Sequence, residues 1–202
     1  MNKISPKSDK RKKIGLFFGS FNPIHIGHLA IANYIVEYSE TDQLWFVVTP
    51  HNPHKKKANL LNDFDRLEMV TMAIKDDDRL QVCDIEFNMP KPSYTVNTLA
   101  YLSDRNPNYI FSIIIGADNF KNFHKWKNYE TIKNNFGIIV YPRPGYTSNE
   151  YKTFPDLTIV EAPRMDISSS FIRDSIKKGK DIRHFLPPVV WEYIDKMGFY
   201  TS

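Results

Sequence analysis

The sequence has very little cysteine and no long apolar run. Its single cysteine, Cys83, excludes an internal disulfide and fits a reducing compartment, so we expect a cytoplasmic protein. No stretch approaches the roughly 20 consecutive apolar residues that a membrane-spanning helix needs. The apolar segment 14–18 is too short for the hydrophobic region of a signal peptide. The sequence therefore predicts no membrane partner.

The chain also has no net positive charge outside its N-terminus. The formal net charge is +4, but residues 1–13 carry +5 and the remainder carries −1. A surface for duplex nucleic acid needs lysine and arginine spread over one face of a domain, whereas here they gather in that segment and in the short run 55–57. We therefore expect no nucleic-acid partner, and we predict that residues 1–13 form a disordered basic tail.

The rest of the chain has the composition of a globular domain. Of 202 residues, 42% are hydrophobic and 25% are charged, which predicts a single domain over residues 14–202. Apolar, strand-like runs alternate with amphipathic stretches. Strands are expected at 14–19, 44–49, 80–85, 110–115, 136–141 and 157–160, and helices at 27–38, 63–75, 95–104, 126–134, 168–177 and 188–196. This order predicts an α/β fold, a Rossmann-like doubly wound parallel sheet with a small C-terminal helical portion.

In such sheets, ligands bind beyond the carboxyl ends of the strands. The two commonest phosphate loops, Gly-x-Gly-x-x-Gly and Gly-x-x-x-x-Gly-Lys-Ser/Thr, are missing. The first expected strand nevertheless leads into a loop that begins at Gly19 and a helix that begins near Gly27. Gly19 lets a ligand approach the backbone, and the free N–H groups of the helix start favour an anion. His25 and His28 would add side-chain donors to the same rim.

Two other interpretations of these histidines remain open. The i, i+3 spacing of His25 with His28, and of His51 with His54, also occurs in zinc sites, although neither pair has cysteine or carboxylate company. Alternatively, His25 and His28 cap and pack the start of the helix.

A second helix start carries three hydroxyls, Ser168 to Ser170, with Arg173 one turn inside. Serines at such a position most often cap the helix. Backbone N–H groups, hydroxyls and a guanidinium can also bind a phosphate together. Two anion-binding helix starts on one sheet would suit a polyphosphate ligand.

Together, these two motifs resemble those of a known enzyme family. The segments Gly19-Ser20-Phe21-Asn22-Pro23-x-His25-x-Gly27-His28 and Ile167-Ser168-Ser169-Ser170-x-Ile172-Arg173 resemble the signatures of nucleotidyltransferases, and within them of bacterial nicotinate mononucleotide adenylyltransferases. Intermediate motifs agree: Pro53-His54-Lys55, Phe64-Asp65-Arg66, Ser93-Tyr94-Thr95, Gly116-Ala117-Asp118, Trp126 and Arg143-Pro144-Gly145. The resemblance covers about residues 14–200. Asn22, Ser170 and Asn97 depart from the usual Asp, Thr and Asp, and Asn97 loses a charge.

The resemblance implies attack of the nicotinate mononucleotide phosphate on the α-phosphorus of ATP. The products would be nicotinate adenine dinucleotide and pyrophosphate, a step of NAD biosynthesis. Because the nucleophile is already an anion, the reaction needs alignment and charge neutralisation and no general base. Mg²⁺ is expected to arrive with ATP, without a metal site of its own.

The resemblance also implies roles for individual residues. The expected catalytic residues are His25, His28 and Arg173. The expected ATP-binding residues are Gly19, Ser20, Phe21, Gly27, Gly116, Asp118, Ile167, Ser168 and Ser169. The expected mononucleotide-binding residues are Lys55, Tyr94, Thr95, Trp126 and Arg143. From the residues alone, Asp118 could equally cap a helix and Trp126 could be a core residue.

Three alternative functions remain open. An amide-preferring nicotinamide mononucleotide adenylyltransferase would share most of these motifs. A phosphopantetheine adenylyltransferase usually has threonine at the position of His25 and is typically shorter. A non-catalytic nucleotide-binding module could share the fold, because fold alone does not fix activity. The sequence does not indicate an oligomeric state.

Overall fold

The computed structural model describes residues 10–50, 60–143, 145, 154 and 156–201. At its centre is a six-stranded sheet in the order β3-β2-β1-β4-β5-β6, and every pairing is parallel. The strands are β1 (Lys12–Gly19), β2 (Gln43–Val48), β3 (Leu80–Cys83), β4 (Tyr109–Gly116), β5 (Gly137–Tyr141) and β6 (Leu157–Ile159). The strand order reverses between β1 and β4, so the predicted doubly wound, Rossmann-like sheet is confirmed.

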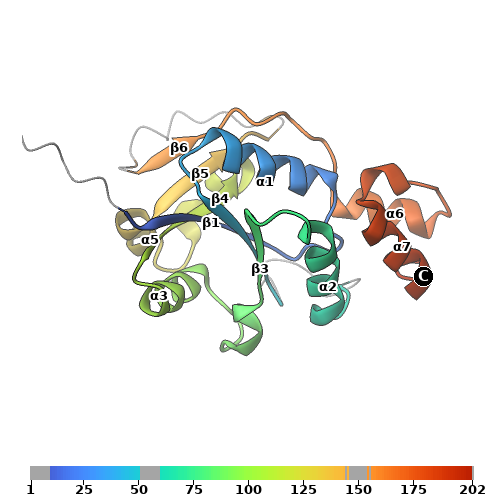
Figure 1. Cartoon of the computed structure of the whole chain (residues 1–202), viewed down its shortest axis with the longest axis horizontal. Coiled ribbons are helices and arrows are strands. Elements are labelled where there is room, and N and C mark those ends of the chain that lie inside the picture. Colours follow the sequence, from blue (N-terminus) through green and yellow to red (C-terminus); the bar gives the residue numbers. More distant parts are fainter. Residues whose placement is uncertain (1–9, 51–59, 144, 146–153, 155, 202) are drawn as a thin grey trace, which may run out of the picture.

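Helices cover both faces of this sheet (Figure 1). The helices are α1 (Ile26–Tyr38), α2 (Asp63–Ile74), α3 (Thr95–Arg105), α4 (Ala117–Phe120), α5 (Tyr129–Asn135), α6 (Ser169–Lys177) and α7 (Pro188–Met197). Short 3-10 turns are η1 (Ile85–Asn88), η2 (Phe123–Lys125) and η4 (Arg183–Phe185). Helices α6 and α7 lie together at one end of the molecule, where the Tyr193 hydroxyl donates to Asp65 Oδ1 of α2 at 3.2 Å.

The core consists of two apolar clusters, one on each face of the sheet. Residues of β4 alternate between them, with Ile114 in the cluster under α1 and α2 and with Ile113 and Ile115 in the cluster under α3 and α5. This alternation follows from the two-residue repeat of a strand. The strands read as apolar on both faces because both faces are covered.

The strands that surround the centre of the sheet end at a common edge. Gly19, the last residue of β1, is paired with Val48 of β2, and Gly116, the last residue of β4, is paired with Tyr141 of β5. The segments that follow these four strands therefore leave the sheet side by side. This carboxyl edge is where a ligand of a doubly wound sheet is expected.

Most boundaries lie within two residues of the sequence prediction, and two of the differences matter for the fold. Lys12 and Lys13, which we assigned to the tail, pair with Tyr109 and Ile110 and therefore belong to β1; residues 1–9 lie outside the described part of the chain. The helix expected over 126–134 begins only at Tyr129. Asn128 has a left-handed φ of 52°, which breaks the helical path between η2 and α5.

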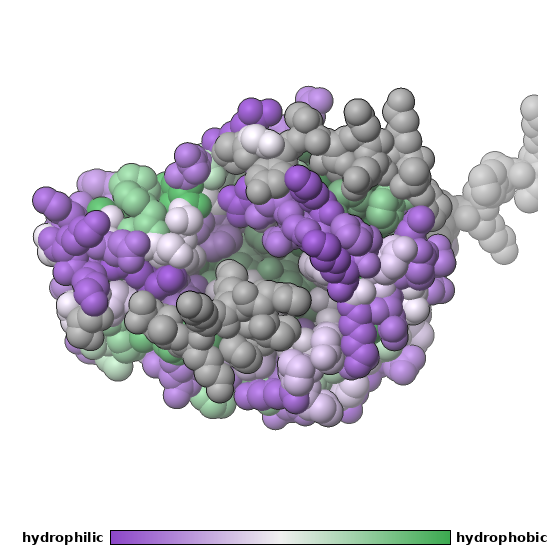
Figure 2. All heavy atoms as spheres, turned by 180° about the vertical axis from the view of Figure 1, so that it is seen from behind, coloured by the Kyte–Doolittle hydropathy of each residue, from purple (hydrophilic) through white to green (hydrophobic). Residues whose placement is uncertain are grey.

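The surface is not uniformly polar. On the face seen from behind, Figure 2 shows a hollow with apolar residues at its floor and hydrophilic residues around it. Within the described residues, no helix is long and apolar enough to cross a membrane.

Candidate active site

The loop after β1 has an unusual backbone. Phe21 has a φ of 43°, in the left-handed region that residues other than glycine rarely adopt. The Phe21 ring folds back over Gly19, and a Cβ built on Gly19 would lie only 2.8 Å from the Cζ atom of that ring. The same ring contacts the His28 ring edge-to-face, with centroids 5.1 Å apart. Gly19 therefore leaves room for the Phe21 ring, which packs beside His28.

This loop is held by side chains from the C-terminal part of the chain. Arg173 Nη1 donates to the Asn22 carbonyl at 2.7 Å, and Ser169 Oγ donates to the Pro23 carbonyl at 2.9 Å. The Tyr200 hydroxyl donates to Asn22 Oδ1 at 2.8 Å. The structure therefore brings the two motifs that were recognised in the sequence into direct contact.

Ser168, at the start of α6, both caps the helix and is exposed to solvent. Ser168 is the N-cap residue, and its Oγ accepts a hydrogen bond from the Phe171 N–H at 3.1 Å. Ile167 packs against the first core cluster. A Cβ on Gly27 would lie 3.1 Å from the His25 ring and 3.6 Å from Ile167, so the glycine leaves room chiefly for the His25 imidazole.

His25 and His28 lie together at the start of α1. Their rings are stacked, with centroids 3.7 Å apart, and the His25 backbone N–H donates to His28 Nδ1 at 3.3 Å. Because Nδ1 of a neutral His28 then accepts, its proton resides on Nε2, which becomes the donor. The fold thus fixes one hydrogen-bond direction of His28.

His25 has a different environment. It is 4% exposed, and burial, followed by the charge of Arg143, lowers the pKa of His25 to about 4. The imidazole is therefore neutral at pH 7. His25 and His28 form a reciprocal capping box at the start of α1, and the buried His25 Nδ1 makes no well-aligned hydrogen bond among the described residues.

Unpartnered buried polar atoms gather at the carboxyl edge of the sheet. Among the described residues, such side-chain atoms are His25 Nδ1, Thr49 Oγ1, Asp118 Oδ1, Arg143 Nε and Trp45 Nε1. The first four follow β1, β2, β4 and β5, and the fifth lies within β2. Because buried polar groups in native proteins are normally hydrogen-bonded, this concentration indicates a place for a polar ligand.

Asp118 and Arg143 approach each other where β4 and β5 end. Arg143 Nε lies 3.9 Å from Asp118 Oδ1, and its Nη2 donates to the Tyr141 hydroxyl at 3.1 Å. A Cβ on Gly116 would lie 2.4 Å from Asp118 Oδ1, so the absence of a side chain makes room for that carboxylate. Within the described part of the chain Oδ1 makes no hydrogen bond, and the N-cap residue of α4 is Gly116, so helix capping does not account for Asp118.

The residues expected at the pyridine ring lie in adjoining segments. Tyr94 is the N-cap residue of α3 and Thr95 is its first residue, while Trp126 directly follows η2. The Lys127 ammonium lies 4.1 Å from the centroid of the Tyr94 ring, which joins the two segments. Trp126 is half-buried against Phe123, so it contributes to the core as well. Lys55 and His54 lie outside the described residues.

Sequence reasoning gave no role to Arg66, a fully buried residue of α2. Its Nη1 donates to the carbonyls of Ser20 at 2.6 Å and Thr49 at 2.9 Å, and its Nε donates to the Leu61 carbonyl at 3.1 Å. Arg66 therefore ties together the segments that follow β1 and β2. An arginine on the apolar face of a predicted helix was the available signal.

Thr49 was also missed as a site residue, because the sequence prediction placed it at the end of the strand 44–49. Glu86, a buried acid, is the third such residue and is treated below.

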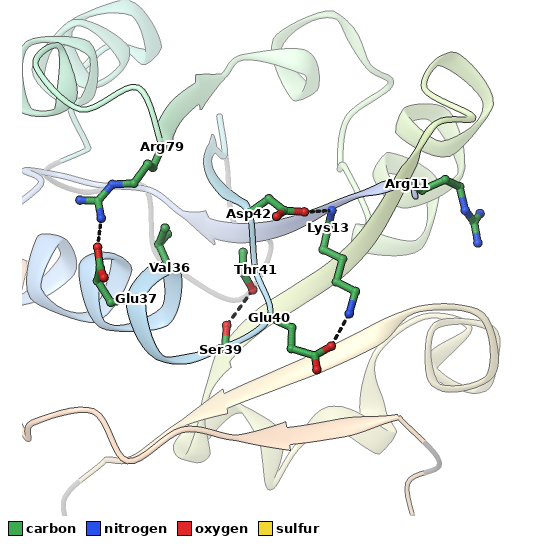
Figure 3. Close-up of a pocket in the computed structure, with 9 residues that line it drawn as sticks. All are labelled: Arg11, Lys13, Val36, Glu37, Ser39, Glu40, Thr41, Asp42 and Arg79. Carbon is green, nitrogen blue, oxygen red and sulfur yellow. Dashed lines mark hydrogen bonds and ion pairs between the residues drawn. The ribbon is translucent and has the colours of Figure 1, made fainter. Parts of the chain in front are cut away.

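A separate hollow, of about 550 Å³, lies at the opposite edge of the sheet, near the start of β1 and the end of α1 (Figure 3). Its charged side chains pair with one another: Arg79 with Glu37, and Lys13 with Glu40. The Lys13 backbone N–H also donates to Asp42 Oδ2 at 2.7 Å. Because these charges are mutually satisfied, the hollow has the character of a surface ion-pair network.

Comparison with known proteins agrees with this geometry. Residues 16–175 match the Cytidylyltransferase-like family. A relative from Flavobacterium johnsoniae, named a probable nicotinate-nucleotide adenylyltransferase, is 54% identical over 192 residues, which are 94% of this chain and 100% of the relative. A protein of the same name from Bacteroides fragilis is 47% identical, over 91% of this chain and 92% of its own.

The solved structure of Plasmodium falciparum nicotinic acid mononucleotide adenylyltransferase complexed with NaAD has the same fold. Its TM-score is 0.79 at 23% identity, over 94% of this chain and 98% of that one. Fold, paired helix starts and sequence match together define a nucleotidyltransferase of the Cytidylyltransferase-like type. More narrowly, the chain belongs to the nicotinate-nucleotide adenylyltransferase family, which confirms the resemblance seen in its motifs.

Proposed function

We propose that this protein transfers the adenylyl group of ATP to nicotinate mononucleotide. An oxygen of the mononucleotide phosphate forms a bond to the α-phosphorus, and the bond from that phosphorus to the oxygen bridging to the β-phosphorus breaks. Pyrophosphate leaves and nicotinate adenine dinucleotide remains. The observation that carries this proposal is the set of buried polar atoms at the carboxyl edge that make no hydrogen bond among the described residues, His25 Nδ1, Thr49 Oγ1, Asp118 Oδ1 and Arg143 Nε.

His28, His25 and Arg173 are assigned to the phosphates of ATP. His28 offers an Nε2–H donor of fixed direction to the α-phosphate, where negative charge is redistributed in the transition state. His25 is neutral when free, and the anionic phosphates would raise its pKa again. Arg173 supplies positive charge from α6 while it holds the loop after β1.

The remaining ATP contacts come from the glycine-flanked loop and the second helix start. Gly19, Ser20 and Phe21 line the groove, and the first N–H groups of α1 and α6, with Ser168 and Ser169, face the β- and γ-phosphates. Asp118 is assigned to the ribose. Mg²⁺ enters with ATP, held mainly by phosphate oxygens and water. The described residues offer no cluster of three or more His, Cys, Asp or Glu side chains that would hold a metal separately.

The mononucleotide is assigned to the neighbouring segments after β4 and before α3. Trp126 would stack on the pyridine ring, and Tyr94 with Thr95 would place its carboxylate. Arg143 and Lys55 are the candidates for its phosphate. The single, buried Cys83 fits a reducing cytoplasm as the place of the reaction.

The test is pyrophosphate release from MgATP and nicotinate mononucleotide by the wild type and by His28→Ala. We expect turnover to fall by about 10²-fold, the effect of removing one transition-state donor. His184→Ala, which removes an exposed histidine of η4, is the matched control and should leave turnover unchanged. Near-normal turnover of His28→Ala with an unaltered melting temperature would contradict the role given to His28.

A further inference from the structure

Glu86 is a buried acid that no step of the proposed reaction uses. It lies in η1 and is 2% exposed. Each of its carboxylate oxygens accepts a bond from a hydroxyl: Oε2 from Ser93 Oγ at 2.9 Å, and Oε1 from Thr98 Oγ1 at 2.7 Å. Among the described residues, no ion pair accompanies it. Burial of a carboxylate without a cation is unfavourable, so its hydrogen bonds are the interactions that hold it there.

The two hydroxyls flank the segment that was assigned to the pyridine ring. Ser93 directly precedes Tyr94, and Thr98 lies one turn into α3, which begins at Thr95. The carbonyl of Tyr94 in turn accepts from the backbone N–H groups of Asn97 and Thr98. The Tyr94–Thr95 peptide is therefore fixed on both sides. On one side Glu86 holds Ser93, and on the other Glu86 and the helix backbone hold Thr98.

Serine and threonine hydroxyls at a helix start usually bond to the local backbone. Here the Ser93 hydroxyl donates to the buried Glu86 carboxylate from a different turn, and the Thr98 hydroxyl lies closer to that carboxylate, at 2.7 Å, than to the local Tyr94 carbonyl, at 3.5 Å. This arrangement fixes the angle at which η1 meets α3. A shift of that angle would move Tyr94 and Thr95 without touching the loop after β1 or the start of α6.

We infer that Glu86 is a positioning residue for the mononucleotide, holding Ser93 and Thr98 so that Tyr94 and Thr95 meet the pyridine end of the substrate. The inference rests on the proposed function. Its failure can be told apart from failure of that function, because the ATP phosphates are assigned to other elements. Loss of Glu86 should therefore weaken use of the mononucleotide and leave use of ATP intact.

The experiment measures KM for nicotinate mononucleotide and for ATP, with kcat, in Glu86→Ala and Glu86→Gln. We expect Glu86→Ala to raise KM for the mononucleotide by about tenfold or more, since small misplacements of binding groups have large effects. KM for ATP should stay within about twofold of the wild-type value. Glu86→Gln should restore most of the loss, because its amide has one oxygen to accept from one hydroxyl and an NH₂ group to donate to the other. Glu68→Ala, an exposed acid of α2, is the matched control.

The outcomes separate this inference from the proposed function. If the wild type releases no pyrophosphate from these substrates, the proposed function fails. If the wild type is active, then an unchanged mononucleotide KM in Glu86→Ala, an equal rise in both KM values, or an equal loss in Glu86→Gln overturns the positioning role. Should Glu86→Ala fail to fold, Ser93→Ala and Thr98→Val each remove one of the two bonds. A selective rise in the mononucleotide KM in these variants supports the inference, and no rise overturns it.

Discussion

Arg66 offers the most direct test of how the carboxyl edge is held together. Its guanidinium is 0% exposed and donates to backbone carbonyls of Ser20, Thr49, Pro50 and Leu61, as well as to Asp63 Oδ1 at 2.5 Å. Arg66→Met keeps an unbranched chain in the same space and removes every one of these donors. Carbonyls from segments after β1, after β2 and before α2 would then lose their partner at once.

The expected cost follows from those bonds. A buried acceptor left without a partner costs about 1–3 kcal/mol, but effects within one network are not additive. Asp63 is 28% exposed, so the loss comes chiefly from the carbonyls left without a donor, and we expect it to be about 3–5 kcal/mol of unfolding free energy. For a domain of this size, this loss lowers the melting temperature by roughly 6–20 °C. Arg66→Lys keeps the charge with fewer donors, so its melting temperature should lie between those of the wild type and Arg66→Met.

The assay is thermal and urea unfolding of the wild type, Arg66→Met, Arg66→Lys and a matched control, Arg79→Met. Arg79 forms ion pairs with Glu37 and Asp77 at the surface, with 41% of its side chain exposed. Such pairs contribute about 0–1 kcal/mol, so the control should melt close to the wild type. If Arg66→Met and Arg79→Met lose equal stability, Arg66 does not hold the edge as described.

Two further predictions concern the site itself. Burial lowers the pKa of His25 from 6.5 to about 4, so the unfolded chain binds the proton first as pH falls, and the stabilisation present above pH 6.5 is lost towards pH 4. Urea unfolding of His25→Asn across this range should show a flatter pH dependence than the wild type, and equal slopes would contradict the burial argument. Gly116→Ala places a Cβ against Asp118 Oδ1 and should raise KM for ATP about tenfold while the circular dichroism spectrum is unchanged. An unchanged KM would remove Asp118 from the ATP site.

The fold was predictable where the pattern is local. The apolar run 110–115 became β4 because both of its faces are covered, and the three serines at the start of α6 predicted a cap that the structure places at Ser168. The start of α5 was wrong because the left-handed Asn128 leaves no clear sign in the apolar pattern. Helix α4 was missed because four residues are too few to show a helical period.

The site was predictable as two motifs but not as a connected structure. His25 and His28 follow a predicted strand, so their place at the edge could be inferred. The contact of Arg173 with Asn22 is tertiary and leaves no trace in spacing. Glu86 received no role because a single charged residue ordinarily indicates a solvated face, and only the structure shows that it is buried; the place of Arg66 on the apolar face of its helix was a signal that was not used.

The central claim is adenylyl transfer to the acid form of the pyridine mononucleotide. It is tested most directly by pyrophosphate release with MgATP and, side by side, nicotinate mononucleotide, nicotinamide mononucleotide and phosphopantetheine. We expect nicotinate mononucleotide to be used with clearly the highest kcat/KM of the three. A preference for either of the other two would contradict the assignment of Tyr94, Thr95 and Trp126, and no release with any of them would contradict the catalytic function itself.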